Sequence, residues 1–245
     1  MFEIISDHQF WVGLGQIILI NIVLSGDNAV VIALAARSLP PRQQKLAVLW
    51  GAGAAVVMRI ILTVVAVELL RYPYLKIVGA LLLVWIAIKL LMPEDGGEGD
   101  VESIANLWAA IKTILIADLV MSLDNVIAVA AAAKGSLLLL ILGLAISIPL
   151  VIFGATLLMK VMDRWPIIIT IGAGLLGWVA GEMIVTDPLI KDWVDASAAY
   201  LHWLAPATGV AFVVLLGKWL AARAEAAQPE VVDLAVEPGE EKSQH

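Results

Sequence analysis

Residues 24–30 read LSGDNAV, and they interrupt the apolar run GLGQIILINIVLSGDNAVVIALAA that extends over residues 13–36. A carboxylate and an amide are poorly suited to such a run, because an unpaired charge buried in hydrocarbon carries a large desolvation cost. Asp27 and Asn28 therefore need partners that compensate for their burial. The rest of the chain indicates where those partners are.

The composition places the chain in a lipid bilayer. Hydrophobic residues make up 62% of its 245 residues, charged residues make up 15%, and the mean hydropathy is +0.97. A soluble globule of this length would expose too much apolar surface. Apolar stretches of about 20 residues, the length that crosses about 30 Å of hydrocarbon, occur near residues 10–36, 46–69, 74–92, 107–133, 136–159, 165–185 and 203–222. We predict an all-α membrane protein with seven transmembrane helices.

Positive charge in the short loops predicts the orientation of these helices. With the N-terminus outside, the inner helix ends collect more Lys and Arg, among them Arg37, Arg42 and Lys45, than the outer ends. The outer ends hold Arg71, Lys76, Lys134 and Lys191. We therefore expect a multi-pass protein of the cell membrane, the inner one in a double-membrane bacterium, with the N-terminus outside and the C-terminus in the cytoplasm.

The opening motif occurs twice. Residues 21–30 read NIVLSGDNAV and residues 118–127 read DLVMSLDNVI. The alignment matches polar residues in both copies: Asn21 with Asp118, Ser25 with Ser122, Asp27 with Asp124 and Asn28 with Asn125. The following helices also correspond, WGAGAAVV at 50–57 with LGLAISIP at 142–149 and IVGALLLVWIAIK at 77–89 with TIGAGLLGWVAGE at 170–182. The chain is therefore an internal duplication of three helices.

An odd number of helices per copy predicts that the second copy enters the membrane from the opposite side. This is the inverted-topology repeat of many secondary transporters, which bind substrate near the midplane between the repeats. We expect the following segments: a first repeat at 1–92, an acidic cytoplasmic linker at 93–106, a second repeat at 107–185, an outer loop and extra seventh helix at 186–223, and a disordered acidic cytoplasmic tail at 224–245.

The spacing within each motif places its polar groups on one helix face. Asn21, Ser25 and Asn28 follow the i, i+4, i+7 pattern, and the second copy repeats it. Asp27 lies about 100° round from Asn28 on a regular helix. Local unwinding would turn both groups inward, and Gly26 makes this easier in the first copy than Leu123 does in the second.

These ligand types suit a hard divalent cation. Carboxylate, amide and hydroxyl oxygens favour Mn²⁺, Mg²⁺ or Ca²⁺, whereas Zn²⁺ and Cu⁺ would recruit Cys, His or Met, and the chain has no cysteine. The candidate metal ligands are Asp27, Asn28, Asp124, Asn125, Asn21 and Asp118, with Ser25 and Ser122 in support. Two Asp carboxylates neutralise one divalent ion, and without it one of them would take up a proton, so exchange of metal against protons is a possible route.

Other buried polar residues have two interpretations each. Arg59 lies near the middle of its apolar stretch and has no counterpart, because Val151 occupies the matching position. It either neutralises the metal site between ions or pairs structurally with a carboxylate. Glu182 near an outer helix end either lines an outer vestibule or lies at the interface. Gly177 and Gly181 are spaced for close helix packing.

The paired SGDN and SLDN motifs and the seven-helix layout resemble the TerC family of integral membrane proteins, in particular its shorter, YjbE-like members. The resemblance covers about residues 8–222. It implies manganese efflux, or Mn²⁺ supply to exported metalloenzymes, with Asp27, Asn28, Asp124 and Asn125 as metal-site residues. It also implies tellurium resistance for founding members, although a site of acidic side chains should repel an oxyanion.

Other functions fit the sequence less well. An intramembrane enzyme would need a nucleophile or metal-bound water, and the chain has no HExxH, GxSxG or paired His, so we expect no enzyme and no cofactor besides the divalent cation. No cytoplasmic segment carries a basic patch for nucleic acid. A non-transporting membrane partner that supplies or senses metal would keep the same site. The lipid bilayer and the cation are the expected partners, and a homo-oligomer is left open.

Overall fold

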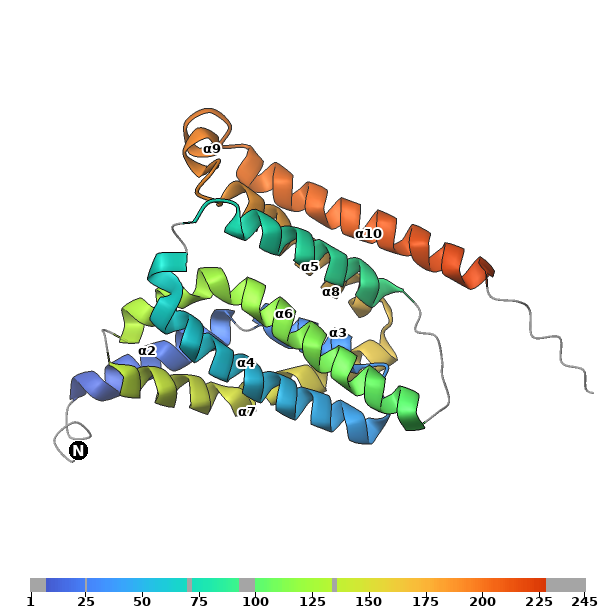
Figure 1. The fold of residues 1–245 in the computed structure, drawn as a ribbon, viewed down its shortest axis with the longest axis horizontal. Coiled ribbons are helices and arrows are strands. Elements are labelled where there is room, and N and C mark those ends of the chain that lie inside the picture. Colours follow the sequence, from blue (N-terminus) through green and yellow to red (C-terminus); the bar gives the residue numbers. More distant parts are fainter. Residues whose placement is uncertain (1–7, 25, 70–71, 93–99, 134–135, 228–245) are drawn as a thin grey trace, which may run out of the picture.

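The computed structural model describes residues 8–24, 26–69, 72–92, 100–133 and 136–227, and no strand occurs within them. Helices account for nearly all of these residues (Figure 1). They are α2 (His8–Leu24), α3 (Gly26–Ala36), α4 (Pro41–Leu69), α5 (Leu75–Leu91), α6 (Asp100–Ala133), α7 (Leu137–Arg164), α8 (Ile167–Val185), α9 (Lys191–Ser197) and α10 (Leu201–Ala227).

Each of the seven predicted spans coincides with a helix or a helix pair. Among the described residues, five helices are long and apolar enough to cross a membrane, and the number rises to six when α2 and α3 count as one bent span. The remaining predicted span corresponds to α5, whose 17 residues are somewhat short of the about 20 that a perpendicular span uses. Large apolar side chains such as Phe153, Trp203 and Leu215 are exposed, as lipid contact requires. The chain is thus a multi-pass membrane protein.

The first motif lies at a bend. The axes of Phe10–Asn21 and Gly26–Ala36 differ by 48°, whereas α6 continues through Leu123 without a break. A side chain at Gly26 would enter open space, so packing does not require glycine there. The bend makes Asp27 and Asn28 the first turn of α3.

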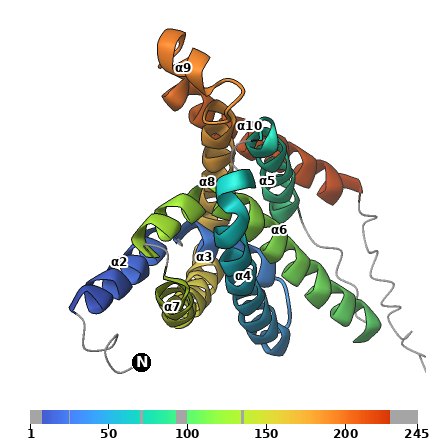
Figure 2. The ribbon, with the colours of Figure 1, turned by 60° about the vertical axis from the view of Figure 1, so that its left-hand side comes forward.

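The helices form two groups. One contains α5, α8 and α10, which lie side by side in both views (Figures 1 and 2). The other contains α2, α4, α6 and α7, and α3 lies between the groups. The third helices of the two predicted repeats, α5 and α8, therefore pack against each other. The two copies are interlocked in this way.

Matching glycines show the same exchange between copies. A methyl group at Gly51 of α4 would collide with Ile114 of α6, and one at Gly143 of α7 would collide with Ile17 of α2. Gly51 and Gly143 occupy matching positions in the duplication, and so do Ile17 and Ile114. Each first helix thus packs on the second helix of the other copy, which is the arrangement expected of two halves related by a pseudo-two-fold axis.

Close packing of α8 on α10 confirms the prediction for Gly177 and Gly181. A Cβ at Gly177 would meet the carbonyl oxygen of Gly209, and one at Gly181 would meet the carbonyl oxygen of Ala205. Glycines therefore let the two backbones approach.

Element boundaries differ from the prediction in three places. Helix α6 begins at Asp100 and so includes the last part of the predicted linker, because residues 100–106 contain no Gly or Pro to end it. The predicted outer loop contains the short helix α9. Helix α10 continues to Ala227, and the rest of the predicted tail, residues 228–245, lies outside the described residues, as do residues 93–99 of the linker.

Candidate cation site

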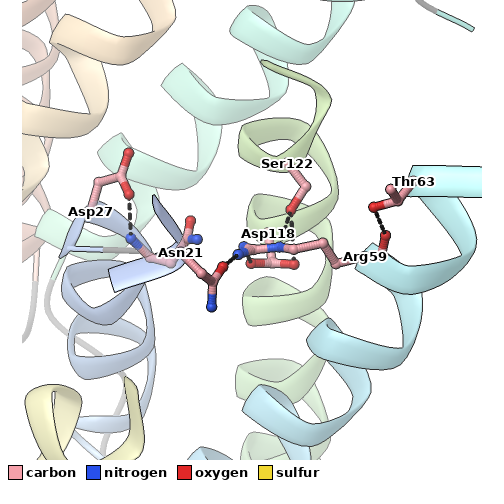
Figure 3. Close-up of polar contacts among 7 residues, drawn as sticks. Asn21, Asp27, Arg59, Thr63, Asp118 and Ser122 are labelled. Carbon is pink, nitrogen blue, oxygen red and sulfur yellow. Dashed lines mark hydrogen bonds and ion pairs between the residues drawn. The ribbon is translucent and has the colours of Figure 1, made fainter. Parts of the chain in front are cut away.

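Arg59 is the centre of a buried polar cluster (Figure 3). It lies in the interior of α4 with 3% of its surface exposed. Its guanidinium donates from Nη1 to Oδ1 of Asn21 on α2 (2.6 Å) and from Nη2 to Oδ1 of Asp118 on α6 (2.6 Å). Its Nε donates to Oγ of Ser122, also on α6, at 3.0 Å. One side chain therefore joins three helices.

The carboxylate of Asp118 is held from two sides. Besides the Arg59 guanidinium, it accepts a hydrogen bond on Oδ2 from the Ser122 hydroxyl at 3.2 Å. Ser122 reaches it because residues four apart lie on one helix face. Breaking such a buried ion pair by removing one partner typically costs about 3–5 kcal/mol, so the cluster also ties α4 to α6.

A small cavity of about 20 Å³, room for about one water molecule, lies beside this cluster. Its polar lining consists of Asn21, Asn28, Arg59 and Asp118. Asn28 is 3% exposed, and among the described residues neither its Oδ1 nor its Nδ2 has a hydrogen-bond partner. A buried polar group without a partner costs about 1–3 kcal/mol. The cavity thus holds an amide whose hydrogen-bonding capacity the protein leaves unused.

The cavity lies where the two copies of the duplication meet. Its lining contains both members of three matched pairs: Asn21 with Asp118, Val56 with Ile148, and Arg59 with Val151. A pseudo-two-fold axis would pass through such a place. The copies differ in charge at two of these pairs, because Val151 matches Arg59 and Asp118 matches Asn21.

The other described candidates, Asp27, Asn125 and Glu182, differ in burial. Asp27 is partly buried in the first turn of α3, its Oδ1 accepts a hydrogen bond from the backbone N–H of Asn28 at 2.8 Å, and it is within electrostatic reach of Arg59 and Asp118. Asn125 is buried on α6 at 9% exposure. Glu182 is exposed on α8.

Two predicted site residues have no described side chain. Ser25 lies outside the described residues, and Asp124 belongs to α6 but its side chain lies outside the described side chains. Within the described part of the chain, no three His, Cys, Asp or Glu side chains gather as a metal-binding group. The oxygens of Asn21, Asp118 and Ser122 do come together, and there they hold a guanidinium.

Asp187 is a buried carboxylate that the motif search missed. It is fully buried after α8 and accepts hydrogen bonds from the backbone N–H groups of Tyr74, Lys76 and Ile77 at 3.1, 3.1 and 3.3 Å. The first N–H groups of a helix lack intrahelical acceptors, so Asp187 caps α5. An acidic residue in a predicted outer loop carries no sequence signal for this role, because its partners are up to 113 residues away.

Comparisons with known sequences give this arrangement a context. The family described as "Integral membrane protein TerC family" matches residues 6–225. Membrane protein YjbE of Bacillus subtilis (strain 168) is 42% identical over 209 residues, which are 85% of this chain and 95% of YjbE. Membrane protein YceF of the same organism is 28% identical over 74% of each chain. Inner membrane protein YgdQ of Escherichia coli (strain K12) is 27% identical over 68% of this chain and 77% of YgdQ. No solved structure matches the chain significantly.

Proposed function

Because this chain belongs to the TerC family of integral membrane proteins, we propose that it transports a divalent cation, most favourably Mn²⁺, out of the cell through the cavity beside Asn28. This activity is carriage of an ion and involves no catalysis. The ion is the substrate, and the protein needs no further cofactor.

The unpartnered amide of Asn28 is the observation that carries the proposal. A structural asparagine in a membrane protein forms hydrogen bonds between helices, but the Asn28 side chain has none within the described residues and borders a cavity. The free energy lost by leaving it unpaired is recovered if a ligand binds its oxygen. The motif that contains Asn28 also occurs twice in the chain.

The chemistry of the lining favours a hard cation. The amide oxygens of Asn21 and Asn28 and the carboxylate of Asp118 border the cavity, with Asp27 close by, and oxygen ligands of this kind suit Mn²⁺, Mg²⁺ or Ca²⁺. An oxyanion would find the positive group of the described lining, Arg59, already bonded to Asp118. Selection of Mn²⁺ among these ions rests on the family resemblance.

Transport requires that the cavity open to each side of the membrane in turn. The proposed mechanism is alternating access by two inverted three-helix repeats, with the N-terminus outside. The interlocked packing of α2 on α7 and of α4 on α6 supports it, since two equivalent half-structures meet at the cavity and each can form one of two exit paths.

Uptake of Mn²⁺ into liposomes that contain the purified protein tests the proposal. The variants are Asn28→Leu and Asp27→Asn, and the matched control is Asp163→Asn, which removes an exposed carboxylate at the end of α7. We expect uptake by wild type and control, loss of at least tenfold in both site variants, and competition by other divalent ions.

Two results would contradict the proposal. Wild-type protein that binds Mn²⁺ but moves none would favour a non-transporting partner that supplies or senses metal for exported enzymes. Site variants that transport at the control rate would place the ion elsewhere.

A further inference from the structure

We infer that the Arg59 guanidinium is a built-in competitor of the transported ion: it occupies the oxygens of Asn21 and Asp118 between transport events and must leave them when a divalent cation enters. This inference rests on the proposed function and concerns how the same site is regulated. It assigns to Arg59 a role that the ion-pair geometry alone does not require.

The guanidinium uses the oxygens that a hard cation would need. It bonds Oδ1 of Asn21 and Oδ1 of Asp118 at 2.6 Å each, and Oγ of Ser122 at 3.0 Å. Asn28, in contrast, borders the same cavity and is left unpaired. The cluster therefore resembles a cation site in which the Arg59 guanidinium occupies some of the oxygen ligands.

Space and charge both prevent the two cations from sharing the site. The cavity of about 20 Å³ holds about one water molecule, so an ion bound to Asp118 would lie directly against the guanidinium. Like charges repel strongly at such separations where the dielectric constant is low. The two cations therefore exclude each other.

The balance of charge also indicates that Arg59 must leave before a divalent cation binds. Among the described side chains near the cavity, Asp27, Asp118 and Arg59 together carry one net negative charge, which is one fewer than a divalent ion requires. With Arg59 withdrawn, the two carboxylates balance a divalent ion fully. An Arg side chain is long and flexible enough to move between such positions, and α4 carries it next to the cavity.

Arg59 provides positive charge in the site when no metal ion is bound. After the ion leaves, a dry site with an unbalanced carboxylate would resist the return conformational change, because buried charge must be paired. By pairing with Asp118, Arg59 supplies one of the two positive charges that the departing ion takes away, without a proton. The matching position in the other copy is Val151. The first repeat alone therefore supplies a guanidinium at this position.

Binding and two kinds of flux test the inference. Mn²⁺ affinity is measured by electron paramagnetic resonance of free Mn²⁺ for wild type, Arg59→Gln, Arg59→Lys and the exposed control Arg164→Gln. In liposomes, net uptake is compared with exchange of internal against external Mn²⁺. Thermal stability with and without Mn²⁺ monitors folding.

We expect Arg59→Gln to bind Mn²⁺ at least tenfold more tightly than wild type, to exchange Mn²⁺ at a near-normal rate, and to lose most net uptake, because the return step lacks its counter-charge. Its thermal stability should fall without Mn²⁺ and recover with it. Arg59→Lys, which keeps the charge with fewer directed donors, should bind Mn²⁺ more tightly by a smaller factor and retain net uptake.

Each contrary outcome has a distinct meaning. Wild type that neither binds nor moves Mn²⁺ overturns the proposed function itself. Wild-type transport combined with unchanged or weaker Mn²⁺ binding in Arg59→Gln overturns the competitor role alone and leaves a structural ion pair. If Arg59→Gln does not fold even with Mn²⁺, binding by Arg59→Lys no tighter than by Arg164→Gln overturns it.

Discussion

At the scale of single residues, the buried side chains of Arg59 and Asn28 differ in their hydrogen bonding. Arg59, Asp118 and Ser122 are mutually bonded, as buried polar groups normally are. Asn28 is buried to the same degree, and in the described part of the chain neither polar atom of its side chain has a partner. Stability and ligand binding should therefore respond differently to substitution at these positions.

Asn28→Leu should separate binding from stability. Leucine has the same branching and the same number of side-chain heavy atoms as asparagine, and the adjoining cavity gives room for its larger methyl groups. The substitution removes a buried amide without a partner, so the free energy of unfolding should stay unchanged or rise, by up to about 1–3 kcal/mol. Mn²⁺ binding should be lost. Thermal denaturation in detergent and Mn²⁺ titration of the same sample check both statements, and a clear loss of stability would show that Asn28 has a structural partner.

Asp118→Asn should behave in the opposite way. It leaves the Arg59 guanidinium buried with a neutral partner, so the free energy of unfolding should fall by about 3–5 kcal/mol. Asp163→Asn at an exposed position should change it by less than about 0.5 kcal/mol. Equal stability of the two variants in chemical denaturation would be inconsistent with the buried ion pair.

Part of this site can be read from the sequence. The i, i+4 spacing of Asp118 and Ser122 predicts that they share a helix face, and their carboxylate and hydroxyl are in contact. Helical periodicity cannot predict which side chain of another helix fills the space between them. Arg59 was therefore open to two interpretations, and an arginine near the middle of an apolar stretch was the signal that it is buried and paired.

At the scale of helices, close backbone approach determines the α8–α10 contact. The glycine spacing in GAGLLGWVAG predicts it, because small residues one turn apart form a groove. Helix α9 and the first turns of α6 were not predicted, since neither has an apolar stretch long enough to be recognised as a span.

Gly177→Ala should weaken this contact. The added methyl group meets the Gly209 carbonyl group at about 2.5 Å, so the helices must separate, at a cost of about 1–3 kcal/mol. Gly174→Ala on the same helix is the matched control, because its methyl group would meet Val210 at an ordinary 3.4 Å and gains the same helix propensity. Thermal stability in detergent should fall only for Gly177→Ala, and a fall of equal size in both variants would indicate a different cause.

Asp187→Ala should loosen the start of α5. The substitution removes the carboxylate that accepts three N–H groups at residues 74, 76 and 77, and loss of a helix cap costs about 0.5–2 kcal/mol. Hydrogen exchange should become faster in the first turn of α5 and stay unchanged in α7. Unchanged exchange at residues 76 and 77 would show that water or another group caps α5 equally well.

At the scale of the whole molecule, the duplication predicts two equivalent halves but not how they join. Sequence alignment pairs Gly51 with Gly143 and the two motif helices with each other, and in the structure each copy packs against the other through these residues. Alignment alone would equally allow two repeats that fold separately. The exchange of partners brings Asn21 of one motif and Asp118 of the other to the lining of the same cavity.

On this model of transport, a divalent ion binds in the cavity between the two copies, in place of the Arg59 guanidinium. Anomalous diffraction from crystals grown with Mn²⁺ tests it most directly, because the anomalous signal locates the metal itself. We predict a peak bounded by Asn21, Asn28 and Asp118, with the Arg59 guanidinium withdrawn from Asp118. Anomalous peaks confined to other parts of the molecule, with the Arg59–Asp118 pair intact in a sample that transports Mn²⁺, would contradict it.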